Sequence, residues 1–127
     1  MKRLDFFIDW PAPMSPNRFR ALSTRLRMSV TRVEREKARM IARKAAIEQK
    51  VEPFTGPAVI SLIVFRRRLL DPSINLPSSC KATQDGICLA VLPMGDGPNS
   101  PYTWSPITQV EVTLKSLEGV QVTIEEP

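Results

Sequence analysis

The sequence predicts an α+β domain in which two helices pack on a small mixed β-sheet, in the approximate order βαβαββ. Apolar runs of strand length lie near both ends and in the middle of the chain, and two stretches between them have helical periodicity. Prolines and glycines concentrate in the intervening segments. The chain has 127 residues, of which 43% are hydrophobic and 24% charged, which suffices for one core. We therefore expect a single domain over residues 1–127.

The N-terminal half is expected to contain one strand and one long helix. Residues 4–10 are apolar and aromatic, which is typical of a strand, and the prolines within 11–16 then favour an extended loop. Residues 18–28 are basic and without clear periodicity. A helix is predicted from about Thr31 to Gln49, because Thr31-Arg32-Val33-Glu34 has the pattern of a capping box.

This predicted helix has an apolar half and a basic half. The apolar positions that share one half of the helical wheel are Val30, Val33, Ala38, Met40, Ile41, Ala45 and Ile47. The basic positions on the opposite half are Arg32, Arg35, Arg39, Arg43 and Lys50. Two readings of the basic stripe stay open: a solvated helix face, or a ridge that follows a phosphate backbone.

The C-terminal half is expected to contain a buried strand, a shorter helix and a hairpin. Residues 59–65 are almost entirely apolar and rich in β-branched residues, which predicts a strand buried on both faces. A helix is predicted over 79–91, in which Gly86 would allow close packing against the sheet. Residues 110–114 and 120–124 alternate in polarity around a turn at 116–119, which indicates a β-hairpin. Loops are expected at 52–57, 72–77 and 93–106.

Histidine is absent, which excludes serine–histidine triads, histidine zinc sites and histidine-dependent nucleases. The two cysteines, Cys80 and Cys88, are expected to be reduced thiols of a cytoplasmic protein. No signal peptide is evident, and the longest apolar run, residues 58–65, is too short to cross a membrane. Catalysis, if present, would depend on carboxylates, lysine, metal ions or the backbone.

The net charge of +5 is unevenly distributed along the chain. Residues 1–68 contain sixteen Lys or Arg against six Asp or Glu, whereas residues 69–127 contain two against seven. A basic half of this kind favours a polyanionic partner such as DNA. The arginines expected to contact phosphates are Arg18, Arg20, Arg25, Arg27, Arg32, Arg66, Arg67 and Arg68. Phe19 lies among them, and an apolar side chain there could wedge into a branch point.

Three aspartates are placed where they could converge. Asp71 follows the central strand, Asp85 lies on the second predicted helix, and Asp96 follows that helix. Carboxylate oxygens are the ligands that hard divalent cations prefer, so these three residues are candidate metal ligands. Lys81 lies four residues before Asp85, on the same face of the predicted helix. The alternative is that Lys81 and Asp85 form an ordinary surface pair and Asp96 belongs to a turn.

Several motifs resemble RusA-like Holliday-junction resolvases, which are phage and prophage endonucleases. The series Trp10-Pro11-Ala12-Pro13 and Pro16-Asn17-Arg18 resembles the W-P-P-S-N-N-R opening of that family. Asn75-Leu76, Lys81, Asp85-Gly86 and Asp96 follow the family's spacing of N-L, K, D-G and a final D, and Tyr102 and Trp104 resemble the aromatic end of its acidic loop. The resemblance extends from residue 6 to about residue 115.

This resemblance implies a homodimeric endonuclease that cleaves branched DNA with Mg²⁺ or Mn²⁺ in recombination or repair, in the cytoplasm of a bacterial host. It implies catalytic roles for Asp71, Lys81 and Asp96. The sequence departs from the family where an acid is expected, because Ile74 and Gly95 stand at two acidic positions and Asp71 is one residue further from Asn75. Two hypotheses follow: an active resolvase, or a catalytically inactive RusA-like phage protein that binds DNA or a host protein.

Overall fold

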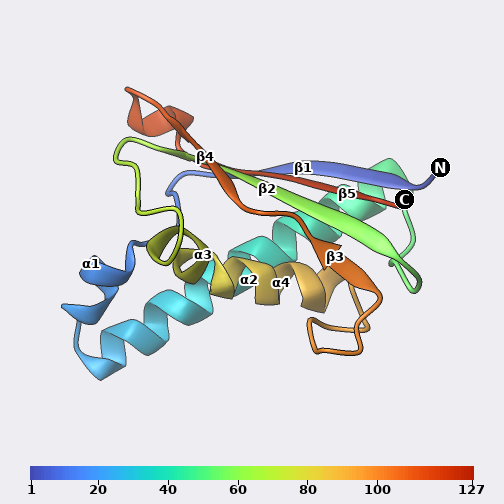
Figure 1. The fold of residues 1–127 in the computed structure, drawn as a ribbon, viewed down its shortest axis with the longest axis horizontal. Helices are drawn as coiled ribbons and strands as arrows, with labels where there is room; N and C mark the ends of the chain where they lie inside the picture. Colours follow the sequence, from blue (N-terminus) through green and yellow to red (C-terminus); the bar gives the residue numbers. More distant parts are fainter.

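The computed structural model describes residues 1–127, and its centre is a mixed sheet of five strands (Figure 1). Its strands are β1 (Arg3–Asp9), β2 (Ala58–Arg66), β3 (Tyr102–Trp104), β4 (Thr108–Glu111) and β5 (Gly119–Glu125). The order across the sheet is β1-β5-β2-β3, and β4 pairs with β2 further along the strand. β5 is antiparallel to both of its neighbours, whereas β3 and β4 are parallel to β2. The predicted α+β class with a mixed sheet is confirmed.

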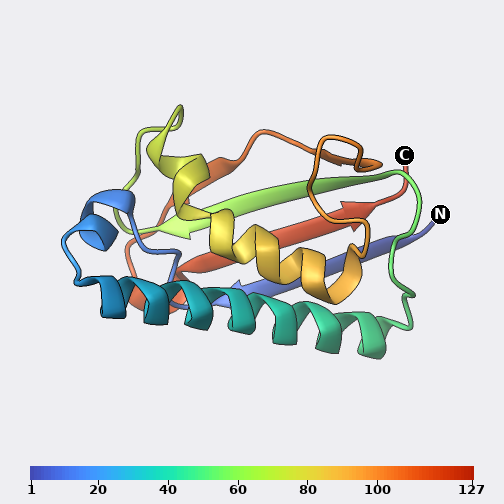
Figure 2. The same ribbon diagram turned by 90° about the horizontal axis from the view of Figure 1, so that it is seen from below.

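Two long helices lie side by side across one face of this sheet (Figure 2). The helices are α1 (Pro16–Arg20), α2 (Thr24–Gln49), α3 (Asn75–Ser79) and α4 (Lys81–Val91), and a short 3₁₀ turn, η1, covers Lys115–Leu117. α2 and α4 correspond to the two predicted helices, whereas α1 and α3 fall in segments expected to be irregular. None of the helices has the length and apolar content that crossing a bilayer would require.

α2 begins seven residues before the predicted start at Thr31. Ser23 is the N-cap, and its hydroxyl accepts a hydrogen bond from the backbone N–H of Leu26 at 3.3 Å. Residues 24–30 contain neither proline nor glycine, so nothing interrupts the helix before Thr31. The expected capping box is therefore wrong, and Glu34 has a different partner.

The buried face of α2 consists of small residues. Ala38, Ala42, Ala45 and Ala46 are buried, whereas three of the larger residues assigned to the apolar half are exposed on the other side of the helix. Those residues are Val33, Met40 and Ile47, which are 58%, 60% and 68% exposed. The helical wheel therefore assigned the wrong residues to the buried face. α4 and the sheet lie so close to α2 that only small side chains such as alanine fit at the contact.

Gly86 is the point of closest approach between α4 and α2. A Cβ atom at this position would lie 2.2 Å from the carbonyl oxygen of Arg35 and 2.8 Å from the Cβ of Ala38. Only glycine therefore permits this separation of the two helices. The close packing expected at Gly86 is present, but it is directed toward α2 rather than toward the sheet.

β2 is covered on one face only. Its residues alternate between buried and partly exposed along the whole strand, which corrects the expectation of burial on both faces. The helices cover the face that contains Ile60, Leu62 and Val64, and the opposite face has no covering layer (Figure 1). On that open face Phe7 and Phe65 make an edge-to-face contact, with ring centroids 6.0 Å apart.

The expected C-terminal hairpin is not formed. β4 and β5 lie on opposite sides of β2, so the two segments that alternate in polarity do not pair with each other. β5 occupies the place between β1 and β2, where Val120, Val122 and Ile124 are almost fully buried. The alternation of polar and apolar residues identified both strands. The partners of β5 were determined by the burial that its apolar residues gain between β1 and β2.

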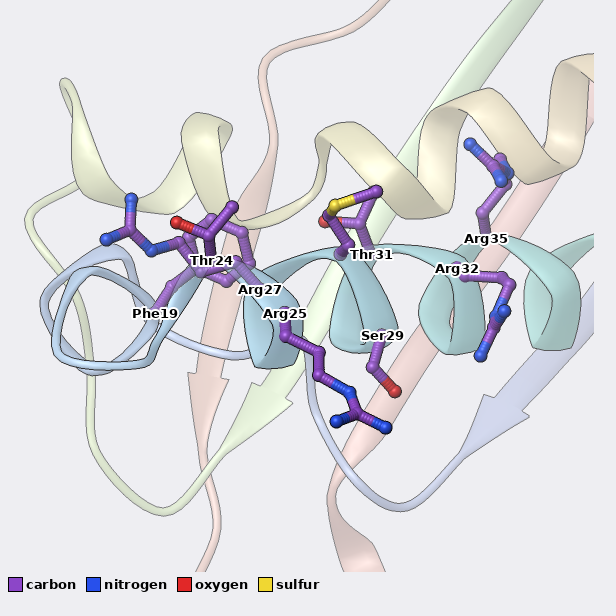
Figure 3. A pocket seen from close by; sticks show the side chains of 9 residues that line it. Phe19, Thr24, Arg25, Arg27, Ser29, Thr31, Arg32 and Arg35 are labelled. Carbon is purple, nitrogen blue, oxygen red and sulfur yellow. The ribbon is translucent and has the colours of Figure 1, made fainter.

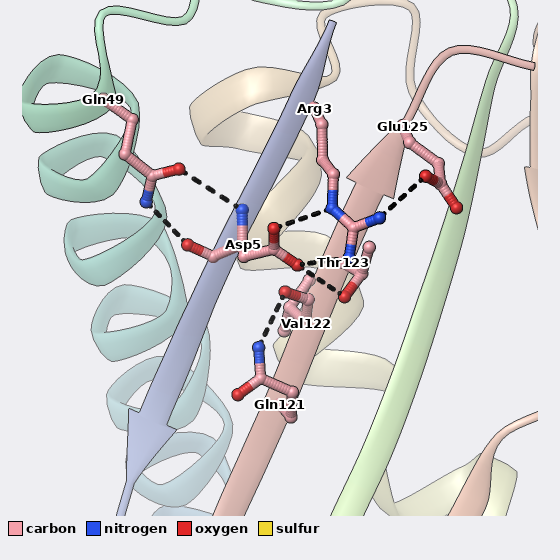
Figure 4. Close-up of polar contacts among 7 residues, drawn as sticks. All are labelled: Arg3, Asp5, Gln49, Gln121, Val122, Thr123 and Glu125. Atoms are coloured by element: carbon pink, nitrogen blue, oxygen red, sulfur yellow. Dashed lines mark hydrogen bonds and ion pairs between the residues drawn. The ribbon is translucent and has the colours of Figure 1, made fainter. Parts of the chain in front are cut away.

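Polar side chains connect the chain ends to the sheet and to α2 (Figure 4). The Arg3 guanidinium donates to Asp5 at 2.8 Å and to Glu125 at 3.2 Å, and the Thr123 hydroxyl donates to Asp5 at 2.8 Å. The Gln49 side-chain amide donates to the backbone oxygen of Asp5 at 2.6 Å, which joins the end of α2 to β1. This network lies away from the end of the fold that contains α1 and α3 (Figure 1).

Candidate nucleic-acid interface

A cleft of about 880 Å³, which we call the loop cleft, lies at the end of the fold near α1 and α3. It is lined by residues 10–18, residues 66–70, Asn75 and Glu118. The first segment begins with a cis peptide bond between Trp10 and Pro11. Residues 10–18 and Asn75, which carry two of the motifs described above, therefore meet residues 66–70 at one cleft.

Arg66 holds the walls of the loop cleft together. This residue is buried, and its guanidinium donates to the backbone oxygen of Arg68 at 3.0 Å and to that of Pro13 at 2.5 Å. Burial lowers the pKa of Arg66 from its usual value, although nearby acids oppose the shift. Because its donors bind the backbone, Arg66 supports the cleft rather than offering a free guanidinium to phosphate.

The neighbouring arginines differ in their availability. Glu118 accepts a hydrogen bond from the Arg67 backbone N–H at 3.1 Å and lies 3.4 Å from its guanidinium. Arg18 and Arg68 are exposed and take part in no ion pair. The loop cleft therefore has two free guanidinium groups at its surface.

A second concave surface, which we call the helix hollow, extends along the first turns of α2 (Figure 3). Its volume is about 930 Å³, and it is lined by Phe19, Thr24, Arg25, Arg27, Met28, Ser29, Thr31, Arg32 and Arg35. Arg27 donates through Nε to the backbone oxygen of Leu22 at 3.0 Å. Arg25 and Arg32 are exposed and have no acidic partner. The hollow is thus a positively charged surface.

A smaller cavity, the central pocket, connects these two surfaces. Its volume is about 330 Å³, and it shares Met14 and Pro16 with the loop cleft and Phe19 and Thr31 with the helix hollow. Arg20, Glu34, Ser78, Ser79, Lys81, Ala82 and Asp85 complete its lining. All eight arginines that were predicted to contact phosphates line one of these three cavities.

Lys81 lies between two aspartates beside the central pocket. As the first residue of α4, it places Nζ 3.3 Å from Asp85, one turn later, and 2.6 Å from Asp96, in the loop that follows the helix. The hydrogen bond from Lys81 lowers the pKa of Asp96, and the same bond raises the pKa of Lys81. All three side chains are more than one-third exposed, so solvent screens this charge pairing.

Asp71 is engaged elsewhere. Its carboxylate accepts hydrogen bonds from the backbone N–H of Ser73 at 3.0 Å and from the Ser73 hydroxyl at 2.8 Å, which lower the pKa of Asp71. Ile74, at a position where the family has an acid, is 67% exposed. No three acidic, histidine or cysteine side chains are grouped so that they could hold a metal ion together. The structure thus brings Asp85 and Asp96 to Lys81 and leaves Asp71 outside that group.

The structure also places Asn75 and the two cysteines. Asn75 lines the loop cleft, and Cys80 and Cys88 are free thiols, as expected. Burial raises the pKa of both thiols, that of Cys88 to about 11. A thiol whose pKa is raised in this way is a poor nucleophile at neutral pH.

Glu34 is the site residue that sequence reasoning did not find. Its carboxylate accepts a hydrogen bond from the backbone N–H of Met14 at 2.8 Å, and burial raises its pKa. The available signal was its helical spacing, since Glu34 precedes the buried Ala38 by four residues and therefore lies on the inner face of α2. An acid on an inner face predicts a specific partner.

Comparison with known proteins adds no relatives, because neither a protein-family model nor a curated protein sequence matches this chain.

Proposed function

We propose that this protein is a structure-selective endodeoxyribonuclease that acts on branched DNA, such as Holliday junctions, with Mg²⁺ or Mn²⁺. The observation that supports it best is the connection of three cavities around α1. They unite the proline-rich loop, the arginines after β2 and the first turns of α2 in one basic surface beside Lys81. A convex DNA backbone needs such a surface, and the Trp10–Pro13 and Pro16–Arg18 motifs, Asn75, Lys81 and Asp85 line it.

The basic surface would bind the phosphate backbone without reading sequence. Arg18, Arg25, Arg32 and Arg68 are exposed and free of acidic partners. Each phosphate neutralised contributes about −0.9 to the slope of log K against log salt, so these four arginines predict a slope of about −4. Binding is expected to weaken steeply between low and physiological salt.

The acidic pair fits one hydrated Mg²⁺ ion better than two. Mg²⁺ commonly binds to one or two carboxylates together with waters and substrate phosphate, and Asp85 and Asp96 offer two. When bound, such an ion would polarise the phosphate and activate water. Lys81 would move its ammonium group from the carboxylates toward the phosphate and stabilise the charge that develops there.

A second candidate function is binding of branched DNA, or of a host protein, without cleavage. The position of Asp71 favours it, because this carboxylate is held by Ser73 and does not join Asp85 and Asp96. The exposed Ile74 favours it for the same reason, since no third carboxylate is supplied.

A cleavage assay on a synthetic four-way junction with Mg²⁺ or Mn²⁺ separates the two candidates. Symmetric nicking that is lost in Asp96→Asn and retained in Asp71→Asn supports a nuclease centred on Lys81. Binding of the junction without nicking in either metal refutes the nuclease and supports the second candidate. Failure to bind DNA even at low salt refutes the nuclease and the DNA-binding form of the second candidate, and leaves only the binding of a host protein.

Three further parts of the proposal depend on the resemblance. A homodimer would match the two-fold character of a four-way junction, and light scattering of the free protein tests it. The cytoplasm of a bacterial host is the proposed location, which the two free thiols suit. A phage or prophage is the proposed source of the gene.

A further inference from the structure

The central pocket is smaller than the two basic surfaces with which it shares lining residues, and its walls are different. Phe19 and Pro16 from α1 and Ala82 from α4 supply apolar surface, and Thr31 and Ser78 supply hydroxyl groups. Its volume of about 330 Å³ lies at the lower end of the range of about 300–1,000 Å³ that small-molecule sites occupy. A flat heteroaromatic ring suits this size, whereas a duplex does not.

Glu34 gives this pocket a chemical preference. One of its carboxylate oxygens accepts the hydrogen bond from Met14, and the other has no hydrogen-bond partner in the protein. The residue is partly exposed, and this second oxygen is not among the buried atoms that lack a partner, so it is accessible to solvent or to a ligand. An ionised carboxylate can only accept hydrogen bonds, so it favours a ligand with an N–H donor and disfavours one that presents a carbonyl.

The residues around the pocket indicate which kind of molecule would carry the heteroaromatic ring. Arg20 and Lys81 belong to its lining, and the helix hollow with Arg25 and Arg32 begins beyond Phe19. Cationic groups around an apolar pocket with an aromatic wall are the arrangement by which proteins bind single-stranded nucleic acid, with phosphates outside and a base stacked inside.

We propose that the central pocket receives one unstacked nucleobase of branched DNA, and that Glu34 selects a base with an exocyclic amino group. This inference depends on the proposed DNA binding and adds a base-specific contact to it. Phe19 would stack on the base, and the free oxygen of Glu34 would accept the amino hydrogen. The phosphate of that nucleotide would then lie toward Lys81, so the pocket would also position the strand at the proposed reaction centre.

Binding of four-way junctions that contain one unpaired nucleotide at the crossover tests this pocket. The nucleotide is cytosine, uracil or an abasic residue, and fluorescence anisotropy without divalent metal measures affinity without cleavage. Cytosine and uracil have the same shape but present an amino and a carbonyl group, respectively, toward a partner. We expect cytosine to bind about tenfold more tightly than the abasic residue and about fivefold more tightly than uracil.

Three variants attribute these differences to the pocket. Phe19→Ala should remove the advantage of either base over the abasic residue, and Phe19→Leu, which keeps the apolar volume, should retain only part of it. Glu34→Gln should reverse the order of cytosine and uracil, because the amide keeps an acceptor for Met14 and turns a donor toward the base. Phe7→Ala, on the open face of the sheet, is the matched control and should change nothing.

Equal affinity of the wild-type protein for all three junctions would overturn the pocket and leave the proposed DNA binding intact. An unchanged order in Glu34→Gln would overturn the role of Glu34. If no DNA of any kind binds at low salt, the proposed function fails as well, which distinguishes the two failures. Circular dichroism of each variant establishes that the comparison is made between folded proteins.

Discussion

Substituting alanine for Gly86 tests the contact between α2 and α4 on which the site is built. The added Cβ would lie 2.2 Å from the Arg35 carbonyl oxygen and 3.0 Å from the Arg39 backbone nitrogen. Both are backbone atoms of α2, so no side-chain rotation relieves the contact. The two helices must separate, which loosens the packing of Ala38 and Ala42 against their neighbours.

Two opposing effects determine the size of the change. Alanine is favoured over glycine within a helix by about 1 kcal/mol, which alone would stabilise α4. Overpacking of a close contact costs about 1–3 kcal/mol, and the contact with rigid backbone at Gly86 places it near the upper end. The net expectation is a loss of about 2 kcal/mol in the free energy of unfolding, or roughly 6–10 °C in Tm for a chain of this size.

Urea unfolding followed by far-UV circular dichroism measures this effect. Gly97→Ala is the matched control, because a Cβ at that loop position has no atom within 4 Å. We expect the control to change the free energy of unfolding by less than about 0.5 kcal/mol. A rise in the stability of Gly86→Ala would show that helix propensity outweighs packing, and would refute the close approach of the two helices.

Other predictions address single residues. Arg66→Met should lower the free energy of unfolding by about 2–4 kcal/mol, since two backbone carbonyls lose a charged donor, and Arg66→Lys should restore only part of it. Met40→Gln should change stability by less than about 0.5 kcal/mol, because this side chain is exposed. Glu34→Gln should remove a loss of stability that the wild-type protein suffers as pH rises from about 4.5, because burial raises the pKa of Glu34 and disfavours its charged form. Lys81→Met should raise the pKa of Asp96 toward the ordinary aspartate value of about 3.9, as measured by NMR titration of the carboxyl carbon.

Each of these has a result that contradicts it. If Arg66→Met had the same free energy of unfolding as the wild-type protein, the loop cleft would hold its shape without the Arg66 side chain. A marked loss in Met40→Gln would place this residue in an interface. For Glu34, parallel pH profiles of the variant and the wild-type protein between pH 4 and 7 would disprove the shift, and an unchanged titration of Asp96 would separate it from Lys81.

The sequence predicted most elements to within a few residues. The strand expected at 4–10 is observed at 3–9, the strand at 59–65 is observed at 58–66, and the helix at 79–91 is observed at 81–91. These elements have strong local signals, namely runs of apolar residues bounded by proline or glycine. The start of α2 was missed because its cap, Ser23, precedes a basic stretch that has no apolar periodicity.

The candidate site was predicted less completely, because its members come from different elements. The approach of Lys81 to Asp85 follows from helical spacing, and Asp96, which was expected to converge with Asp85, lies beside the same lysine. The separation of Asp71 could not be foreseen, since it depends on a turn closed by Ser73 rather than on the end of β2.

By itself, the sequence determined the fold class, the basic character of the N-terminal half and the absence of imidazole chemistry, because composition and local periodicity are properties of the chain alone. Tertiary structure decided which strands pair, which face of α2 is buried and which arginines are free. Those outcomes depend on contacts between distant segments: β5 lies between β1 and β2, where its valines are buried, Gly86 sets the distance between the helices, and Arg66 donates to backbone carbonyls. Long-range packing of this kind has no signature in local spacing.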